Sequence, residues 1–256
     1  MKPWAAPSRR TRQNAVNGES KNLPADTAQV ARRLARVCSR VHTAQRDAGR
    51  DADEVLILAV SKRQSIPAIE AAFQAGQTHF GENYVQEARI KIAALASLPL
   101  HWHFIGQLQA NKTREVAEHF QWVHTLDRTR IARRLNDQRP YGAPPLQACI
   151  QVNQAGEPGK GGVAPGEVEE LARQVIQFPR IALRGLMSIP PAAGDSARFF
   201  AELRILRDRL VSLGIPMDTL SMGMSADLEP AVAAGSTIVR IGTAIFGPRT
   251  APKAGN

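Results

Sequence analysis

The run VLILAVSK occupies residues 55–62, where six aliphatic residues are followed by Ser61 and Lys62. An apolar run of this length predicts a buried strand that ends before the lysine. An ammonium at the mouth of a buried strand either reaches out to water or is held close to a reagent, because desolvation lowers a lysine pKa and frees its lone pair. The residues at the other strand ends decide between these two interpretations.

Short strands and amphipathic helices alternate along the rest of the chain. A first helix is predicted at 26–49, with Asp26 or Thr27 as its N-cap and Gly49 at its end. Eight strands are predicted at 55–60, 78–81, 101–105, 122–125, 146–152, 181–187, 219–221 and 238–241, and helices at 67–75, 84–96, 112–119, 128–137, 165–177, 197–213 and 228–234. Eight such alternations with short connections favour a closed parallel (β/α)8 TIM barrel over an open sheet.

Length and charge suggest one domain with two polar ends. At 256 residues and 43% hydrophobic content the chain can bury a single α/β core, which we place at 23–249. The first fifty residues hold eleven Lys and Arg against three Asp and Glu, so most of the formal charge of +10 lies there. Residues 1–22 lack apolar periodicity and are expected to form a disordered basic arm, and residues 250–256 a flexible C-terminal tail.

Several classes of protein are disfavoured. The arm has no apolar segment of the secretion type, and no stretch is long enough to span a bilayer, so we expect a cytoplasmic protein without membrane contact; organelle targeting by the Arg-rich start is the alternative. The basic excess lies in the first fifty residues and the rest of the chain is nearly balanced, so nucleic acid is not the expected partner.

Cysteines and histidines give no metal-binding pattern. Cys38 and Cys149 lack a CxxC spacing and are expected to be reduced core residues. His101 and His103 share one face of a strand, but a zinc site would need a third ligand at supporting spacing. We therefore expect no metal.

Polar and glycine residues follow the predicted strands. In such a barrel function collects at the carboxyl ends of the strands, whereas the opposite rim mostly stabilises the fold. The residues expected on the carboxyl rim are 61–62, 81–83, 106–107, 153, 188, 222–225 and 242–243. Because the last strand closes against the first, Lys62 should lie beside the segment around Arg240.

Two of these loops are suited to an anion. Phosphate sites in barrels often use the loops after strands seven and eight, where free backbone N–H groups favour negative charge. The segments SMGMSAD at 221–227 and RIGTA at 240–244 occupy these places, and their glycines permit close approach of a ligand. Each loop alone is more typical of an ordinary turn, but together they indicate a phosphate site.

Arg240 adds a third element, since it interrupts an apolar strand and a buried guanidinium needs a carboxylate or a ligand nitrogen as partner. A phosphate cradle, a desolvated lysine and a ring-directed arginine on one rim describe a site for pyridoxal 5′-phosphate (PLP). Lys62 would form a Schiff base with the aldehyde, and Arg240 would face the pyridine nitrogen.

Six longer motifs resemble those of the pyridoxal phosphate homeostasis protein family. They are LAVSK at 58–62, HFGENYVQE at 79–87, WHFIGQLQANK at 102–112, RGLMSIP at 184–190, LSMGMSAD at 220–227 and AGSTIVRIGTAIFG at 234–247. The resemblance runs from about residue 30 to residue 248. It implies a single barrel of the fold-type III PLP proteins, similar to the N-terminal domain of alanine racemase.

The matching motifs imply nine cofactor-binding residues: Lys62, Asn83, His103, Ser188, Met222, Ser225, Arg240, Gly242 and Thr243. Within this set Lys62 would carry the cofactor, Ser225, Gly242 and Thr243 would take the phosphate, and the others apart from Arg240 would line the pocket. The resemblance implies binding, buffering and delivery of PLP, with apo-PLP enzymes as recipients, and we expect a monomer.

One departure concerns a second lysine, which in this family often stands two places after the Schiff-base lysine. Here Gln64 occupies that place, so a transfer step would need another lysine, and Lys160 in a glycine loop is a candidate, although a lysine in such a loop is more typical of a solvated side chain. Glu82 and Asp227 are expected to order loops.

No catalytic residue is expected. A racemase needs proton donors on both faces of the α-carbon, and in the alanine racemases one is a tyrosine associated with a second domain. The chain ends soon after Gly247, so we expect no such domain, and we expect Tyr84 beside the rim and Tyr141 on the opposite rim. Arg240 would keep the ring nitrogen unprotonated, which disfavours carbanion chemistry. The alternatives are a narrowly specific PLP-dependent amino-acid racemase and, third, an arm that binds nucleic acid.

Overall fold

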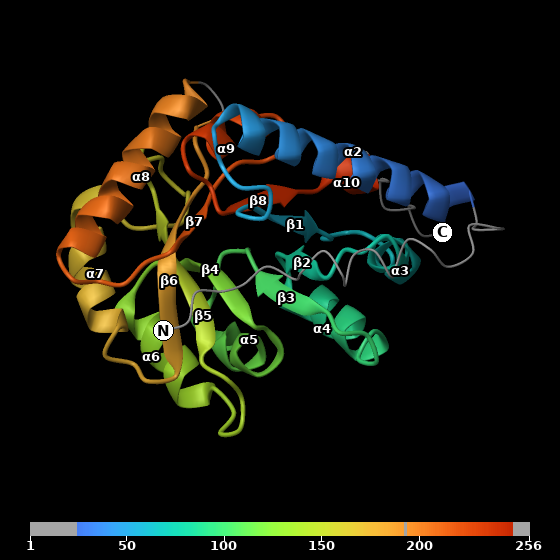
Figure 1. The fold of residues 1–256 in the computed structure, drawn as a ribbon. Helices are drawn as coiled ribbons and strands as arrows, with labels where there is room; N and C mark the ends of the chain where they lie inside the picture. The colour runs from blue at the N-terminus through green and yellow to red at the C-terminus, as the bar shows by residue number, and fades with distance from the viewer. Residues whose placement is uncertain (1–24, 192–193, 248–256) are drawn as a thin grey trace.

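The computed structural model describes residues 25–191 and 194–247, and its centre is a closed barrel of eight parallel strands (Figure 1). Each strand pairs with the next one in sequence, and β8 pairs with β1. The strands are β1 Leu56–Val60, β2 His79–Glu82, β3 His101–Phe104, β4 Trp122–Leu126, β5 Leu146–Val152, β6 Ile181–Ser188, β7 Thr219–Ser221 and β8 Ile238–Ile241. The predicted (β/α)8 barrel is confirmed.

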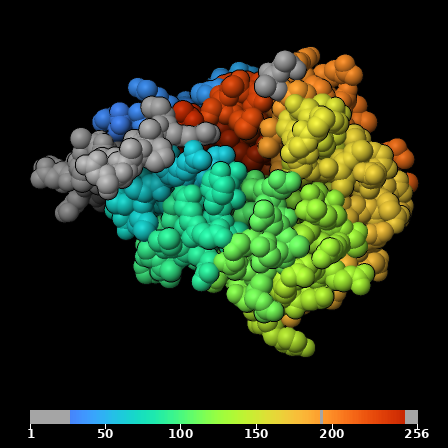
Figure 2. All heavy atoms as spheres, turned by 180° about the vertical axis from the view of Figure 1, so that it is seen from behind, coloured from blue at the N-terminus to red at the C-terminus, as the bar shows by residue number. Residues whose placement is uncertain are grey.

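Helices follow every strand and surround the barrel. The α-helices are α2 Ala25–Asp47, α3 Ile66–Gln74, α4 Val85–Ala94, α5 Thr113–His119, α6 Thr129–Gln138, α7 Val168–Val175, α8 Ser196–Ser212, α9 Leu228–Ala233 and α10 Thr243–Phe246, with short 3-10 helices η1 Ala110–Lys112 and η2 Pro165–Glu167. Figure 2 shows their order on the far face, where the colours run from cyan through green and yellow to orange around the molecule.

Capping residues set several helix ends. The Ser65 side chain accepts from the N–H of Ala68 at the start of α3, and Asp195 accepts from Ala197 at the start of α8. The expected first helix is present, but it begins at Ala25 and ends before Gly49, whose φ of 66° terminates it. Neither α10 nor η1 was expected as a separate helix, because segments of three or four residues carry little periodic signal, whereas η2 forms the start of the helix expected at 165–177.

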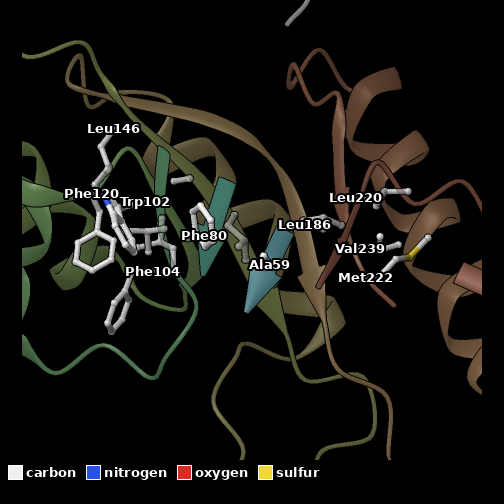
Figure 3. Close-up of a cluster of buried hydrophobic side chains, with 14 of the residues drawn as sticks. Ala59, Phe80, Trp102, Phe104, Phe120, Leu146, Leu186, Leu220, Met222 and Val239 are labelled. Atoms are coloured by element: carbon white, nitrogen blue, oxygen red, sulfur yellow. The ribbon is translucent and has the colours of Figure 1, made fainter. Parts of the chain in front are cut away.

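Side chains alternate between the barrel interior and the layer under the helices, because successive strand residues point to opposite faces. Figure 3 shows part of the outer layer, which contains Ala59 and Phe80. A separate inner cluster contains Leu58 from β1, together with Trp122, Cys149, Met187 and Ile238. The alternation continues past the end of β1 and assigns residue 62 to the inner face.

The long helix α2 covers the place where β8 closes on β1, and Figure 1 shows it beside α9 and α10. Arg33 of α2 donates to the carbonyl of Phe246 at 3.1 Å. Beyond the helix, Arg50 donates to the carbonyls of Val232 and Ser236 at 2.9 and 2.8 Å. The N-terminal helix thus ties the last β/α unit to the first.

The expected arm at 1–22 and tail at 250–256 lie outside the described residues. Within residues 25–191 and 194–247, no helix has the length and apolar character needed to cross a membrane. Cys149 is a free thiol, and burial in the inner cluster raises its pKa to about 12.

Candidate cofactor site

Five of the residues predicted to bind a cofactor lie at, or just after, the carboxyl ends of strands. Lys62 follows β1, Asn83 follows β2 and Ser188 ends β6, while Ser225 lies in the loop after β7 and Gly242 follows β8. Because all strands are parallel and closed into one barrel, these positions share the carboxyl rim.

The pairing of β8 with β1 places the proposed lysine and arginine on neighbouring strands. Leu58 is the register partner of Arg240, so Lys62 lies four residues further toward the carboxyl rim than the partner of Arg240. Gly242 backs onto the same strand, since a Cβ on Gly242 would lie 3.5 Å from the Cβ of Val60. The β8–β1 seam, where the barrel closes, therefore carries Lys62, Arg240 and the glycine loop at Gly242.

The backbone on both sides of the half-buried Lys62 is fixed by hydrogen bonds. The carbonyl of Ser61 accepts from Lys91 Nζ at 2.7 Å. On the other side, the N–H of Arg63 donates to Glu87 Oε1 at 2.5 Å, and Arg63 has a φ of 60°, a region that non-glycine residues seldom occupy. The chain thus turns sharply after Lys62 in a conformation that its neighbours hold.

A buried ion pair lies behind this turn, on the outer side of the barrel. Lys91 Nζ is 2.8 Å from Glu82 Oε1 and 2.6 Å from Glu87 Oε1, and Ser61 Oγ donates to Glu82 at 2.6 Å. Burial raises the pKa of Glu82, and the charge of Lys91 opposes this shift. The expectation that Glu82 orders a loop is confirmed. Sequence reasoning missed Lys91, although its spacing of four residues from Glu87 is a signal for an ion pair.

Arg240 is buried in the barrel interior and is held from two neighbouring strands. Its NH1 donates to the carbonyl and to the hydroxyl of Ser221, at 2.6 and 2.9 Å. Its NH2 donates to the carbonyl of Ser188 at 2.9 Å. Burial lowers the pKa of Arg240 to about 10, which leaves the group charged at neutral pH.

The two glycine loops present unused donors. In the loop after β7, Met224 N–H donates to Asp227 Oδ1 at 2.5 Å, which confirms Asp227 as a loop-ordering carboxylate. Ser225 is half-buried, and α2 fixes its carbonyl through Arg40 at 3.2 Å. Within the described residues, the backbone N–H groups of Ser225 and Gly242 donate to no protein group. Thr243 is exposed and begins α10.

Two residues near the rim carry buried oxygens without a partner among the described residues: Asn83 Oδ1 and Ser188 Oγ. Buried polar atoms are normally satisfied, so an unsatisfied pair at one rim calls for an explanation. Both residues were predicted to line a cofactor pocket. A polar ligand at the rim would supply the missing partners.

His103 lies within the barrel, deeper than a rim position. It is fully buried, stacks on the Trp122 ring at 5.4 Å, and forms hydrogen bonds with His79 and His124. Burial holds its pKa well below the usual histidine range. His101, which shares a strand face with His103, stacks on the His79 ring. Within the described residues, no cluster of His, Cys, Asp and Glu could hold a metal ion.

Met222 faces away from the rim. Its side chain belongs to the outer layer with Leu220 and Val239, as Figure 3 shows. Its backbone N–H donates to Ile238, and its carbonyl accepts from Ser236. Because Ser221 points into the barrel, the strand alternation turns Met222 outward.

Residues 33–250 match the family model described as the N-terminal domain of alanine racemase. The pyridoxal phosphate homeostasis protein of Pseudomonas aeruginosa is 53% identical over 220 residues, which cover 86% of this chain and 96% of the relative. The protein of the same name from Escherichia coli K12 is 50% identical over 226 residues, covering 86% and 97%.

A solved structure of PipY from Synechococcus elongatus without PLP superposes with a TM-score of 0.77 at 38% identity and covers 86% of this chain and all of PipY. The structure of PipY with PLP bound gives a TM-score of 0.75 at 36% identity. The fold and rim thus define a barrel of the alanine racemase N-terminal class. Within that class, the chain belongs to the pyridoxal phosphate homeostasis protein family.

Proposed function

We propose that this chain binds PLP on Lys62 and serves PLP homeostasis by binding, buffering and delivering the cofactor. The observation that carries the proposal is the β8–β1 register, which places Lys62 on the strand next to Arg240, on the rim side of it and close to the donor loop at Gly242. Relatives that are half identical bear the homeostasis name, and PipY has been solved with PLP bound.

The polar atoms at the rim fit such a ligand. The unused N–H groups of Ser225 and Gly242 suit a phosphate, and the hydroxyls of Ser225 and Thr243 can add further donors. The buried oxygens of Asn83 and Ser188 lack partners that a polar ligand would provide. His103 lies beneath the site, where it forms a hydrogen bond with His124. Met222 packs in the outer layer and supports the phosphate loop from there.

The aldehyde of PLP supplies reversible Schiff-base formation with an amine. Lys62 provides that amine, and the hydrogen bonds on Ser61 and Arg63 hold its backbone in place. Arg240 would hold the ring of a bound PLP by donating to its pyridine nitrogen. An arginine remains charged and cannot accept a proton there, so it keeps this nitrogen unprotonated.

We propose that turnover is weak or absent. An unprotonated ring nitrogen withdraws electrons poorly, which disfavours the carbanion chemistry of a racemase. Tyr84 is half exposed at the start of α4, and Tyr141 lies fully exposed in the loop before β5, at the opposite rim. The racemase alternative predicts loss of α-deuterium from a candidate amino acid, at roughly one event per second or faster for a typical enzyme.

Delivery implies recipients and a release route. We propose apo-PLP enzymes as partners, a monomeric protein and a reducing, cytoplasmic location, which two cysteines without a CxxC pattern suit. Lys160 is the candidate second lysine, since Gln64 offers no amine. It pairs with Glu157 and donates to the carbonyl of Pro190 at 3.2 Å, so a transfer role would require release of these contacts.

The experiment is a visible absorption spectrum of PLP-treated protein, followed by borohydride reduction and peptide mapping. Wild type should show the visible absorption band of a Schiff base between PLP and lysine, and peptide mapping should find Lys62 modified. Lys62→Ala should lose this band. Lys112→Ala is the matched control, because Lys112 is a half-buried lysine paired with Glu115. Reduction that leaves Lys62 unmodified in PLP-saturated protein would refute the proposal.

A further inference from the structure

A chain of buried polar side chains crosses the barrel interior beneath the proposed site. His79 Nδ1 is 2.9 Å from His103 Nε2, and His103 Nδ1 is 2.9 Å from His124 Nε2. His124 Nδ1 is 2.7 Å from Ser221 Oγ, which accepts from Arg240 NH1. β4 and β7 are three strands apart, so the bond between His124 and Ser221 spans the interior.

All three imidazoles are neutral at physiological pH. Burial lowers the pKa of His79 and of His124 to about 3, and it holds the pKa of His103 well below its usual range. A neutral imidazole has one N–H donor and one acceptor nitrogen. Each bond between two histidines therefore has one donor, and its direction is set by the tautomers.

The charged end of the chain selects one direction. Arg240 can only donate, so Ser221 Oγ accepts from it and has its own hydrogen to place. His124 Nδ1 is the acceptor within reach, which puts the proton of His124 on Nε2. The same count then puts the protons of His103 and His79 on Nε2. The reverse set of tautomers would bury the Ser221 hydroxyl hydrogen without an acceptor, a loss that costs about 1–3 kcal/mol.

The chain also decides which donors Arg240 keeps for a ligand. Both NH1 hydrogens go to Ser221, and one NH2 hydrogen goes to the carbonyl of Ser188. Among the described residues, the Nε hydrogen and the second NH2 hydrogen have no acceptor. The guanidinium is thus anchored along one edge, and its orientation depends on a hydroxyl that the histidines fix.

We propose that Ser221, His124 and His103 are positioning residues for Arg240, and that with His79 they form a hydrogen-bond chain of one polarity in which every histidine carries its proton on Nε2. This inference rests on the proposed function, because it concerns how Arg240 is presented to the cofactor ring. A purely structural polar core would satisfy the same atoms without influencing the ligand.

The first test is ¹⁵N NMR of histidine-labelled full-length protein at neutral pH, with and without PLP. The inference predicts Nε2–H tautomers for all three residues in PLP-free protein, assigned through His79→Gln, His103→Gln and His124→Gln. It also predicts that PLP shifts the His124 and His103 nitrogens. A protonated imidazole or an Nδ1–H tautomer at any of the three, or an unchanged His124 spectrum on PLP binding, would overturn it.

The second test compares Ser221→Ala with Ser221→Thr, which keeps the hydroxyl. Ser221→Ala should move the absorption maximum of bound PLP and weaken its binding by roughly tenfold, the effect of one hydrogen bond, while Ser221→Thr should restore both. Ser236→Ala is the matched control: this buried hydroxyl donates to the carbonyl of Met222 at 2.7 Å and takes no part in the histidine chain. It should destabilise the fold and leave the absorption maximum unchanged.

These tests separate the two proposals. If PLP never attaches to Lys62, the proposed function fails, and the tautomers of PLP-free protein still decide the polarity. If Lys62→Ala abolishes the PLP band while Ser221→Ala leaves the absorption maximum and the affinity unchanged, the function stands and the positioning role is wrong. Should Ser221→Ala fail to fold, the NMR response of wild-type His124 to PLP decides the matter.

Discussion

The ammonium of Lys91 donates a 2.7 Å hydrogen bond to the carbonyl oxygen of Ser61, the residue that precedes Lys62. The same ammonium neutralises the buried carboxylate of Glu82. One side chain from α4 therefore ties the end of β1 to the end of β2, and it does so from outside the barrel. The position of Lys62 depends on a cation that never enters the proposed site.

Replacing Lys91 with Met should destabilise the protein by about 3–5 kcal/mol, because it leaves the Glu82 carboxylate buried without its counter-charge. The double change with Glu82→Gln should recover most of this loss. Urea unfolding measures both, and the rate of PLP attachment should fall in Lys91→Met because Ser61 is released. Lys112→Met is the control, since its half-exposed pair with Glu115 should contribute about 1 kcal/mol or less. Equal losses for the two lysines would contradict the prediction.

Stability should fall as the pH drops below about 6.5. Unfolded histidines have a pKa near 6.5, whereas burial holds the pKa of His79 and His124 at about 3 and that of His103 well below its usual range. Between these values the unfolded chain binds protons that the folded chain does not, so stability is complete above pH 6.5 and is lost on acidification.

The expected slope is about 1.4 kcal/mol per pH unit for each such histidine. Urea unfolding at several pH values between 7.5 and 5 gives this slope, and His103→Gln should reduce it by one histidine's share. A free energy of unfolding that stays constant from pH 6.5 to pH 5, and that His103→Gln does not change, would contradict the prediction.

Gly223→Ala should damage both the fold and phosphate binding. Gly223 has a φ of 92°, and a Cβ there would lie 2.4 Å from the Cβ of Ala231, so the loop that carries Ser225 must move. Gly214→Ala is a matched control, because Gly214 has a similar φ of 82° and open space around its Cβ position. Gly214→Ala should cost about 1–2 kcal/mol from backbone strain alone.

PLP titration and competition by inorganic phosphate measure the difference. Gly223→Ala should weaken both ligands and cost more stability than Gly214→Ala. If both variants bind PLP as wild type does, the loop after β7 is no part of the phosphate site.

Most of the framework could be predicted from local patterns. Short apolar runs such as 55–60 predict buried strands. The parallel order of eight β/α units then places Lys62, Asn83, Ser188 and Gly242 on one rim. The facing of individual side chains was harder to predict. Met222 was predicted to lie in a loop and to line the pocket. Because Ser221 points into the barrel, the Met222 side chain points outward and packs in the outer layer with Val239.

The sequence by itself determined the barrel, the rim, and the neighbouring strands β1 and β8 that carry Lys62 and Arg240, because hydrophobic periodicity and strand order act over short distances and can be recognised along the chain. Only the tertiary structure decided the partnership of His124 with Ser221, 97 residues away, and that of Lys91 with Ser61, 30 residues away. Such contacts depend on which strands face one another across a closed barrel and on which face each residue occupies. No pattern along the chain encodes that geometry, since it arises when the sheet closes and buried polar atoms must find donors and acceptors in the space that remains.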